Sequence, residues 1–116
     1  MNYANLLHLR DKYKIMEMNI KTDDWLANKS LKKLKIRDEG VMVLGITRKD
    51  GNYIGAPDGT TKIKSAGTLI LYGRDSALEK LYQRKLGSIG DEEHKRAVDE
   101  QKDVVRKEKE LDTMKR

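Results

Sequence analysis

The 116-residue sequence has no cysteine, no phenylalanine and a single proline, and it contains no long apolar run. The absence of cysteine excludes a disulfide framework and any thiolate metal or redox site. No segment approaches the roughly 20 consecutive apolar residues that span a bilayer. Residues 1–10 also lack the charged and then apolar order of a signal peptide. We therefore expect the chain as given to be soluble.

Aromatic residues make up only 5% of the chain, whereas charged residues make up 38%. A chain of this length can bury one modest core, and with this composition the core must be aliphatic and thin. A thin core is often completed by self-association. The composition therefore predicts one domain and favours a homodimer.

The net charge of +6 raises the question of nucleic-acid binding. Residues 91–116 hold eight basic and nine acidic residues, so the positive excess lies in residues 1–90. That excess is spread along the chain and is not interleaved with aromatic residues, as it would be in a groove for single strands. We expect no binding to nucleic acid.

The residue types that build catalytic and metal sites are scarce and badly placed. His8 and His94 are far apart in the sequence, so a metal-binding pair of histidines is not predicted. Asp38 and Glu39 are adjacent and would point to different sides, which does not suit a mechanism with paired carboxylates. The glycines show no phosphate-loop spacing. We expect neither enzymatic activity nor a metal site.

Two segments have the pattern of β-strands. Residues 13–20 alternate strictly, which places Met16 and Met18 on one face, where they are predicted to fill the core. Residues 68–72 are continuously apolar or β-branched and are predicted to form the most buried strand. Trp25, the only tryptophan, is predicted to anchor the packing at the edge of the sheet.

The stretch Val41 to Pro57 is predicted to form a central β-hairpin. Asp50-Gly51 suits a type I′ turn, because both central residues of that turn need positive φ. With a two-residue loop, residues that face each other across the hairpin share one face of the sheet. The predicted pairs are Arg48 with Tyr53, Thr47 with Ile54, and Ile46 with Gly55.

In this register Arg48 stands at the end of an apolar row formed by Met42, Leu44 and Ile46. One interpretation is an ordinary hairpin arginine that extends its charged end into water. The other is a cation held at the rim of an apolar surface, where it could bind an anionic ligand. The residues by themselves leave both open.

Short helices are predicted on either side of these strands. Ser30 can cap a helix over residues 30–35. Asp75 or Ser76 can cap a second helix that lies across one face of the sheet and ends near Gly87 and Gly90. The predicted fold is α/β of the α+β type: a small, mostly antiparallel sheet with a central hairpin, short helices packed on it and a C-terminal helical tail.

The domain is predicted to span residues 13–86, with both ends of the chain outside it. Residues 1–12 are typical of a connector with about two turns of helix. Residues 87–116 are predicted to form a charged helical tail, because oppositely charged residues recur three or four positions apart. Since the apolar stripe of this tail is narrow, we expect residues 91–116 to be dispensable for folding.

The run from Leu31 to Leu81 resembles the TrkA-C domain, also called the C-terminal subdomain of regulators of potassium conductance. The family pattern is a Leu-x-x-Leu helix, an apolar strand ending in Gly-Ile-x-Arg, a turn with glycine, a proline, and a last apolar strand ending in glycine. The matching residues are Leu31, Leu34, Gly45, Ile46, Arg48, Gly51, Pro57 and residues 69–73. The chain departs from the pattern at Ala66-Gly67, where relatives commonly have Gly-Asp.

The resemblance implies a dimerising regulatory domain in the cytoplasm, attached to a potassium channel, transporter or antiporter. Some relatives bind cyclic di-AMP between two subunits. The positions of this chain that match their ligand-binding residues are Ile46, Arg48, Asn52, Ile54 and Pro57. The alternative is a scaffold domain that binds no ligand and holds membrane proteins together. In both cases the membrane partner would be another part of the parent protein or another chain.

Overall fold

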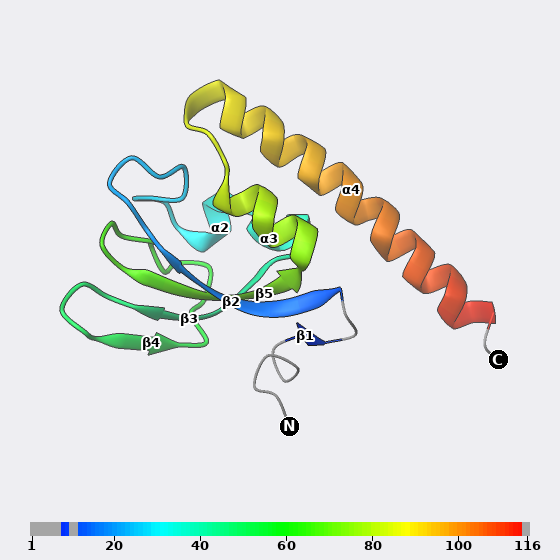
Figure 1. The fold of residues 1–116 in the computed structure, drawn as a ribbon, viewed down its shortest axis with the longest axis horizontal. Helices are drawn as coiled ribbons and strands as arrows, with labels where there is room; N and C mark the ends of the chain where they lie inside the picture. The colour runs from blue at the N-terminus through cyan, green and yellow to red at the C-terminus, as the bar shows by residue number, and fades with distance from the viewer. Residues whose placement is uncertain (1–7, 10–11, 115–116) are drawn as a thin grey trace.

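The computed structural model describes residues 8–9 and 12–114. One antiparallel sheet has the strand order β1, β2, β5, β3, β4. Its strands are β1 (His8–Leu9), β2 (Tyr13–Asn19), β3 (Met42–Thr47), β4 (Tyr53–Gly55) and β5 (Thr68–Arg74). The helices are α2 (Leu31–Leu34), the 3-10 helix η1 (Ile36–Glu39), α3 (Asp75–Tyr82) and α4 (Gly87–Met114). Figure 1 shows α2, α3 and α4 on one side of the sheet, which confirms the predicted α+β fold.

The core lies between the sheet and these helices. Alternation along β2 and β5 places Met18 opposite Leu69, and both side chains are buried. Leu78 and Leu81 of α3 cover this face of the sheet and are also buried. The predicted strand over residues 13–20 and the core role of its methionines are confirmed. β5, which was predicted to be the most buried strand, lies at the centre of the sheet.

The β3–β4 hairpin differs from its prediction in the length of the loop. The Gly51 N–H donates to the Arg48 carbonyl at 2.9 Å, and the Arg48 N–H donates to the Asn52 carbonyl at 2.8 Å, so the loop has three residues. Gly51, with φ of +88°, takes the left-handed conformation that this loop requires. The observed pairs are Gly45 with Gly55, Ile46 with Ile54, and Thr47 with Tyr53. The predicted type I′ register was therefore wrong by one residue.

A β-bulge in β3 changes which side chains share a face. The pairing of β3 with β5 shifts between Val43 and Gly45, which leaves Leu44 as the extra residue. After the bulge the alternation has the opposite phase, so Ile46 enters the core and is 1% exposed, whereas Met42 and Leu44 are 44% and 37% exposed. The predicted apolar row of Met42, Leu44 and Ile46 is wrong, because the bulge divides it between the two faces.

The predicted cap of α2 is confirmed, whereas the predicted cap of α3 is wrong. The N-cap of α3 is Arg74, which makes no side-chain capping hydrogen bond, and Asp75 and Ser76 already belong to the helix. Ser30 Oγ accepts a hydrogen bond from the Lys33 N–H at 3.2 Å, as expected at the start of α2. α3 ends at Tyr82, and the glycines predicted to follow it belong to the first turns of α4. A Cβ on Gly90 would lie 2.6 Å from Trp25 Cδ1, so glycine lets α4 approach the core closely. Trp25 is 5% exposed, which confirms its role as a packing anchor.

Most of the predicted N-terminal connector falls outside the described residues. Where it is described, His8 and Leu9 form the edge strand β1, which pairs with Lys14 and Tyr13, and not a helix. Among the residues that the structure describes, no helix combines the length and the apolar character needed to cross a membrane.

α4 confirms the predicted helical tail, but its first half packs on the domain. The Trp25 indole N–H donates to Asp91 at 3.0 Å, and Ala97 is 6% exposed. The second half extends past the sheet (Figure 1), where Leu111 is 57% exposed. The prediction that residues 91–116 are dispensable for folding stays untested, but these contacts argue against it for the first half of α4.

Candidate functional site

The five residues that match the family's ligand positions lie around the β3–β4 hairpin, but they do not line one cavity. Ile46 and Ile54 face each other across the two strands and belong to or pack against the core. Asn52 is exposed beside the loop. Of the five, Arg48 and Pro57 line cavities, and these are two different cavities. The assignment of a ligand to these residues stays a prediction.

Arg48 is held in place by the structure and does not simply extend into water. Its backbone pairs with Asn52, and its Nη1 donates to the carbonyl oxygen of Lys62 at 2.7 Å. This bond connects the hairpin loop to the segment that precedes β5. The guanidinium therefore has a fixed direction, and its other N–H groups are still available for a ligand.

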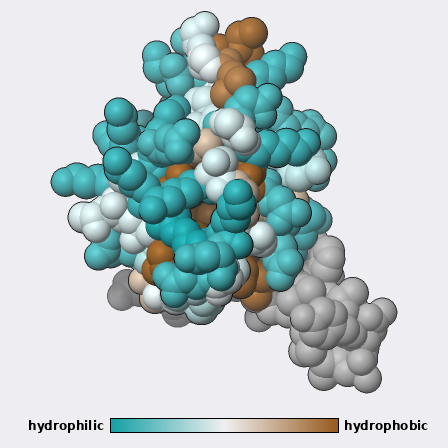
Figure 2. Space-filling model, turned by 90° about the vertical axis from the view of Figure 1, so that its left-hand side faces the viewer, coloured by the Kyte–Doolittle hydropathy of each residue, from teal (hydrophilic) through white to brown (hydrophobic). Residues whose placement is uncertain are grey.

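Arg48 lies in a groove of about 830 Å³ between the hairpin loop and residues 62–65. We call this the basic groove. Its lining residues are Asn28, Arg48, Lys49, Asp50, Lys62, Lys64 and Ser65. The end of the molecule that carries these loops is seen face on in Figure 2, where hydrophilic side chains cover most of the surface.

Pro57 lies in a second groove, of about 380 Å³, between the end of β4 and α2. Its walls include Leu31, Val43 and the exposed turn at Asp58. Hydrogen bonds from the Thr60 hydroxyl and backbone N–H to the carboxylate lower the pKa of Asp58. This groove is more apolar than the basic groove and carries the proline that the resemblance singles out.

A buried polar cluster joins η1, the end of α3 and α4. The Arg84 guanidinium donates two hydrogen bonds to the Glu39 carboxylate, at 2.6 and 2.7 Å, and both side chains are 1% exposed. His94 Nδ1 lies 2.6 Å from the same carboxylate. The two-pronged contact is the strongest form of an Arg–carboxylate pair. We call Glu39, Arg84 and His94 the buried cluster.

Trp25 packs against this cluster and connects it to the loop before α2. The guanidinium carbon of Arg84 lies 4.8 Å from the centre of the indole ring, and Lys29 Nζ lies 4.7 Å from it. The His94 ring is 5.5 Å from the indole. A tryptophan ring attracts cations at these distances. The cluster therefore attaches α4 to the domain, and the side chains of Glu39 and Arg84 are buried in that contact.

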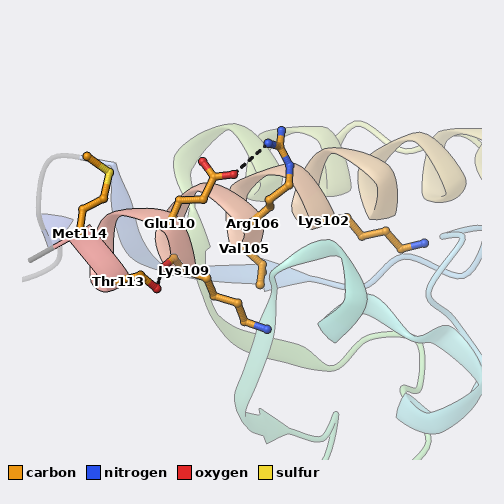
Figure 3. Close-up of a pocket in the computed structure, with 7 residues that line it drawn as sticks. All are labelled: Lys102, Val105, Arg106, Lys109, Glu110, Thr113 and Met114. Carbon is orange, nitrogen blue, oxygen red and sulfur yellow. Dashed lines mark hydrogen bonds and ion pairs between the residues drawn. The ribbon is translucent and has the colours of Figure 1, made fainter. Parts of the chain in front are cut away.

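A shallow hollow runs along the second half of α4, and its lining residues all belong to that helix. Figure 3 shows Val105 and Lys109 on one side of the helix and the ion pair of Arg106 with Glu110 on the other. Nearby, the Tyr13 hydroxyl donates to Glu108 at 3.2 Å. Burial raises the pKa of Tyr13, and the Glu108 carboxylate raises it further. One helix face without opposing walls does not form a binding site.

No group of three or more His, Cys, Asp or Glu side chains within the described residues is arranged to hold a metal ion. His94, which we expected in a solvated tail, is instead half-buried beside Glu39. Sequence reasoning missed the buried cluster, because its members are far apart in the chain. It also missed Lys62 and Lys64, whose alternation about Ile63 was a signal that both would lie on one side.

The class of protein that this fold defines is a small α+β domain with an antiparallel sheet covered by helices on one side. The family model of the TrkA-C domain matches residues 15–85. This is more than half of the chain, which therefore belongs to the TrkA-C domain family, a family of regulatory domains in potassium transport. No curated protein matches the sequence.

The solved structures with the same fold include domains of three proteins. The RCK C domain of the potassium transport protein KtrA, in complex with cyclic di-AMP, has a TM-score of 0.56 and 23% identity over 69% of this chain and 92% of that one. The RCK_C domain dimer of S. agalactiae BusR, also with cyclic di-AMP, has a TM-score of 0.52 and 20% identity over 59% and 92%. The GsuK channel bound to NAD has a TM-score of 0.53 and 17% identity over 63% of this chain and 13% of the channel.

BusR has also been solved in complex with its promoter DNA. The prediction that this chain does not bind nucleic acid therefore remains open. The chain spans 13% of the length of the GsuK channel.

Proposed function

We propose that this chain is the ligand-sensing, dimerising regulatory domain of a cytoplasmic assembly that controls a potassium channel, transporter or antiporter. Its ligand is an anionic nucleotide, of which cyclic di-AMP is the best candidate. The observation that carries the proposal is the position of Arg48. This chain belongs to the TrkA-C family, and its Arg48 matches the family's ligand position. Arg48 lines the basic groove, where a hydrogen bond to the Lys62 carbonyl holds it. No catalytic step is part of the proposal.

The face of the sheet opposite the helices supports the dimer. No described helix covers the part of this face formed by β3 and β4, which carries Met42, Leu44 and Tyr53, whose exposed fractions are 44%, 37% and 56%. Tyr13 and Tyr72 stack on the same face with ring centres 5.7 Å apart. Apolar patches of several hundred Å² on a small soluble domain usually mark an interaction surface. A second copy of the chain would bury this face by twofold symmetry.

We expect light scattering of the full chain to give twice the chain mass at micromolar concentration. Leu44→Glu should convert the dimer to a monomer, because it places a charge in the apolar contact. Leu111→Glu is the control, since Leu111 is also exposed, at 57% against 37% for Leu44, but lies on α4. A wild-type monomer at high micromolar concentration contradicts the dimer, and equal effects of both variants contradict the assignment of this face.

The ligand part of the proposal depends on charge and on apolar contacts. A guanidinium fixed by one hydrogen bond can form forked bonds to a phosphate with its remaining N–H groups. Ile54 and Pro57 are half-buried near the end of the same hairpin and offer apolar surface for a purine.

Arg48→Ala should weaken the binding of cyclic di-AMP by about 1.5–3 kcal/mol, the usual contribution of a hydrogen bond to a charged group. Titration calorimetry on the wild type and the variant measures this effect. Thermal unfolding should change little, since Arg48 lies at the rim of the sheet. Lys33→Ala, an exposed cation on α2, is the control. Equal affinities of wild type and Arg48→Ala would leave Arg48 with no role in ligand binding.

One observation favours the scaffold alternative. The five matching residues do not line a common cavity in the described chain, and Ile46 is 1% exposed. A thermal-shift screen with cyclic dinucleotides, mononucleotides and cations distinguishes the two functions. A ligand that binds the folded state raises the melting temperature. A flat profile for every anionic nucleotide would favour the scaffold and contradict the ligand-sensing proposal.

A further inference from the structure

We propose that the basic groove is a binding site for soluble ligands that carry two or more phosphate charges, and that Lys62 and Lys64 hold these charges together with Arg48. The inference rests on the proposed function and deepens it, because it identifies the phosphate-binding part of the site. It adds residues from the segment before β5, which the family resemblance did not assign to the ligand.

The charge on the groove is positive and not neutralised within the protein. Four cations line it, against the single carboxylate of Asp50. Asp50 Oδ1 accepts the Asn52 N–H at 2.9 Å, so this carboxylate is engaged in holding the loop. Within the described parts of the chain, no ion pair joins Arg48, Lys49, Lys62 or Lys64 to an acidic side chain. Converging cations without partners favour a bound anion.

The wall that carries the two lysines is fixed by the core. Ile63 lies between Lys62 and Lys64 and is 0% exposed. The Ile63 N–H donates to the Lys29 carbonyl at 2.9 Å, and the Ile63 carbonyl accepts from the Asn28 N–H at 2.7 Å. Side chains alternate along an extended segment, so both lysines point away from the core while Ile63 points into it. Their backbone is therefore already in place before a ligand binds.

Arg48 connects the opposite wall to this segment. Its Nη1 donates to the Lys62 carbonyl at 2.7 Å, which places the guanidinium beside the backbone that carries Lys62. Lys62 and Lys64 line the same groove as this guanidinium, so a ligand that enters the groove meets cations from both walls. Sites that are ordered before binding lose less affinity to the ordering of side chains.

The dimensions and the chemistry of the groove favour a small ligand over nucleic acid. Its volume of about 830 Å³ lies in the range of small-molecule sites. No aromatic side chain lines it, so it offers no platform on which the bases of a single strand could stack. The groove therefore recognises phosphate groups. The bases of a nucleotide would be held outside it by other residues, of which Ile54 and Pro57 are the candidates named above.

The test uses the full chain and three probes: sodium pyrophosphate, cyclic di-AMP and a short duplex DNA. Each is titrated by calorimetry at low ionic strength into the wild type, Lys62→Gln/Lys64→Gln and Arg48→Ala. The matched control, Lys33→Gln/Lys107→Gln, removes the same charge from exposed positions on α2 and α4. We expect pyrophosphate to bind the wild type and the control equally, and to bind Lys62→Gln/Lys64→Gln about 100-fold more weakly. This corresponds to about tenfold for each lost charge contact.

The outcomes separate the two proposals. If cyclic di-AMP binds in an Arg48-dependent manner but neither it nor pyrophosphate responds to Lys62→Gln/Lys64→Gln, the inference is overturned and the proposed function stands. If pyrophosphate binds through the lysines and no nucleotide binds, the inference stands and the proposed nucleotide ligand is overturned. Failure of pyrophosphate to bind the wild type overturns the inference. Lysine-dependent binding of DNA that is tighter than binding of pyrophosphate overturns the assignment of a small ligand.

Discussion

Glu39→Ala is expected to destabilise the domain by about 3–5 kcal/mol, the usual cost of removing one partner from a buried ion pair. The substitution leaves the Arg84 guanidinium 1% exposed without its carboxylate, and it removes the partner of His94. Arg84 Nε is already buried without a hydrogen-bond partner among the described residues, so the loss of Glu39 would leave still more of the guanidinium unsatisfied. Because small domains are stable by only about 5–15 kcal/mol, much of the total stability would be lost.

Urea unfolding followed by circular dichroism measures this effect. Glu100→Ala is the matched control, since it breaks the Lys80–Glu100 pair, whose side chains are 50% and 49% exposed. An exposed pair of this kind contributes about 0–1 kcal/mol. Replacing both partners, as in Glu39→Leu/Arg84→Met, should restore most of the stability, because the Arg84 guanidinium is then no longer buried without its carboxylate. A loss below about 1 kcal/mol for Glu39→Ala would show that the buried cluster does not stabilise the fold.

Ending the chain after Gly90 is expected to cost about 3–6 kcal/mol. The truncation removes Asp91 from the Trp25 indole and His94 from Glu39, two hydrogen bonds with a charged partner worth roughly 1.5–3 kcal/mol each. It also removes Ala97, which is 6% exposed, and uncovers the apolar surface beneath it. This expectation replaces, for the first half of α4, the sequence-based prediction that residues 91–116 are dispensable.

The control truncation ends after Lys102 and keeps every contact named in the preceding paragraph. It removes the exposed hydrogen bond from Tyr13 to Glu108, so the free energy of unfolding should change by about 1 kcal/mol or less. Thermal unfolding of the full chain, the chain ending at Gly90 and the chain ending at Lys102, measured in parallel, shows which part of α4 stabilises the domain. Equal stability of the chain ending at Gly90 and the full chain would mean that all of α4 beyond Gly90 is dispensable, as the sequence predicted.

The sequence predicted the elements of this fold well and their registers less well. Strict alternation identified β2, and the continuous apolar run identified β5 as the most buried strand. Ser30 marked the start of α2. The hairpin was placed correctly, but its loop has three residues because the Asp50 carboxylate binds the Asn52 N–H and Gly51 takes the left-handed conformation. Local propensity favours Asp-Gly in more than one turn type, so it could not decide between these loops.

The candidate site was predicted by family pattern and only partly by residue chemistry. Arg48 was singled out on both grounds, and the structure places it in a basic groove. Ile46 was assigned to the same site, yet the bulge in β3 buries it in the core. Lys62 and Lys64 were not singled out, because whether a lysine can bind a ligand depends on which residues face it in the folded protein. That information is absent from a short segment of sequence.

Composition and periodicity by themselves determined that the chain would form one small α+β domain with an aliphatic core and a charged helix at its C-terminal end. The aliphatic core and the charged helix follow from local sequence pattern, because alternation and helical spacing decide which side chains can be buried together. Only the tertiary structure decided where the charges meet. Glu39, Arg84 and His94 are distant in sequence, and their contact depends on how η1, α3 and α4 pack together. The same packing, with the bulge in β3, decided which of the predicted ligand residues reach solvent and which support the core.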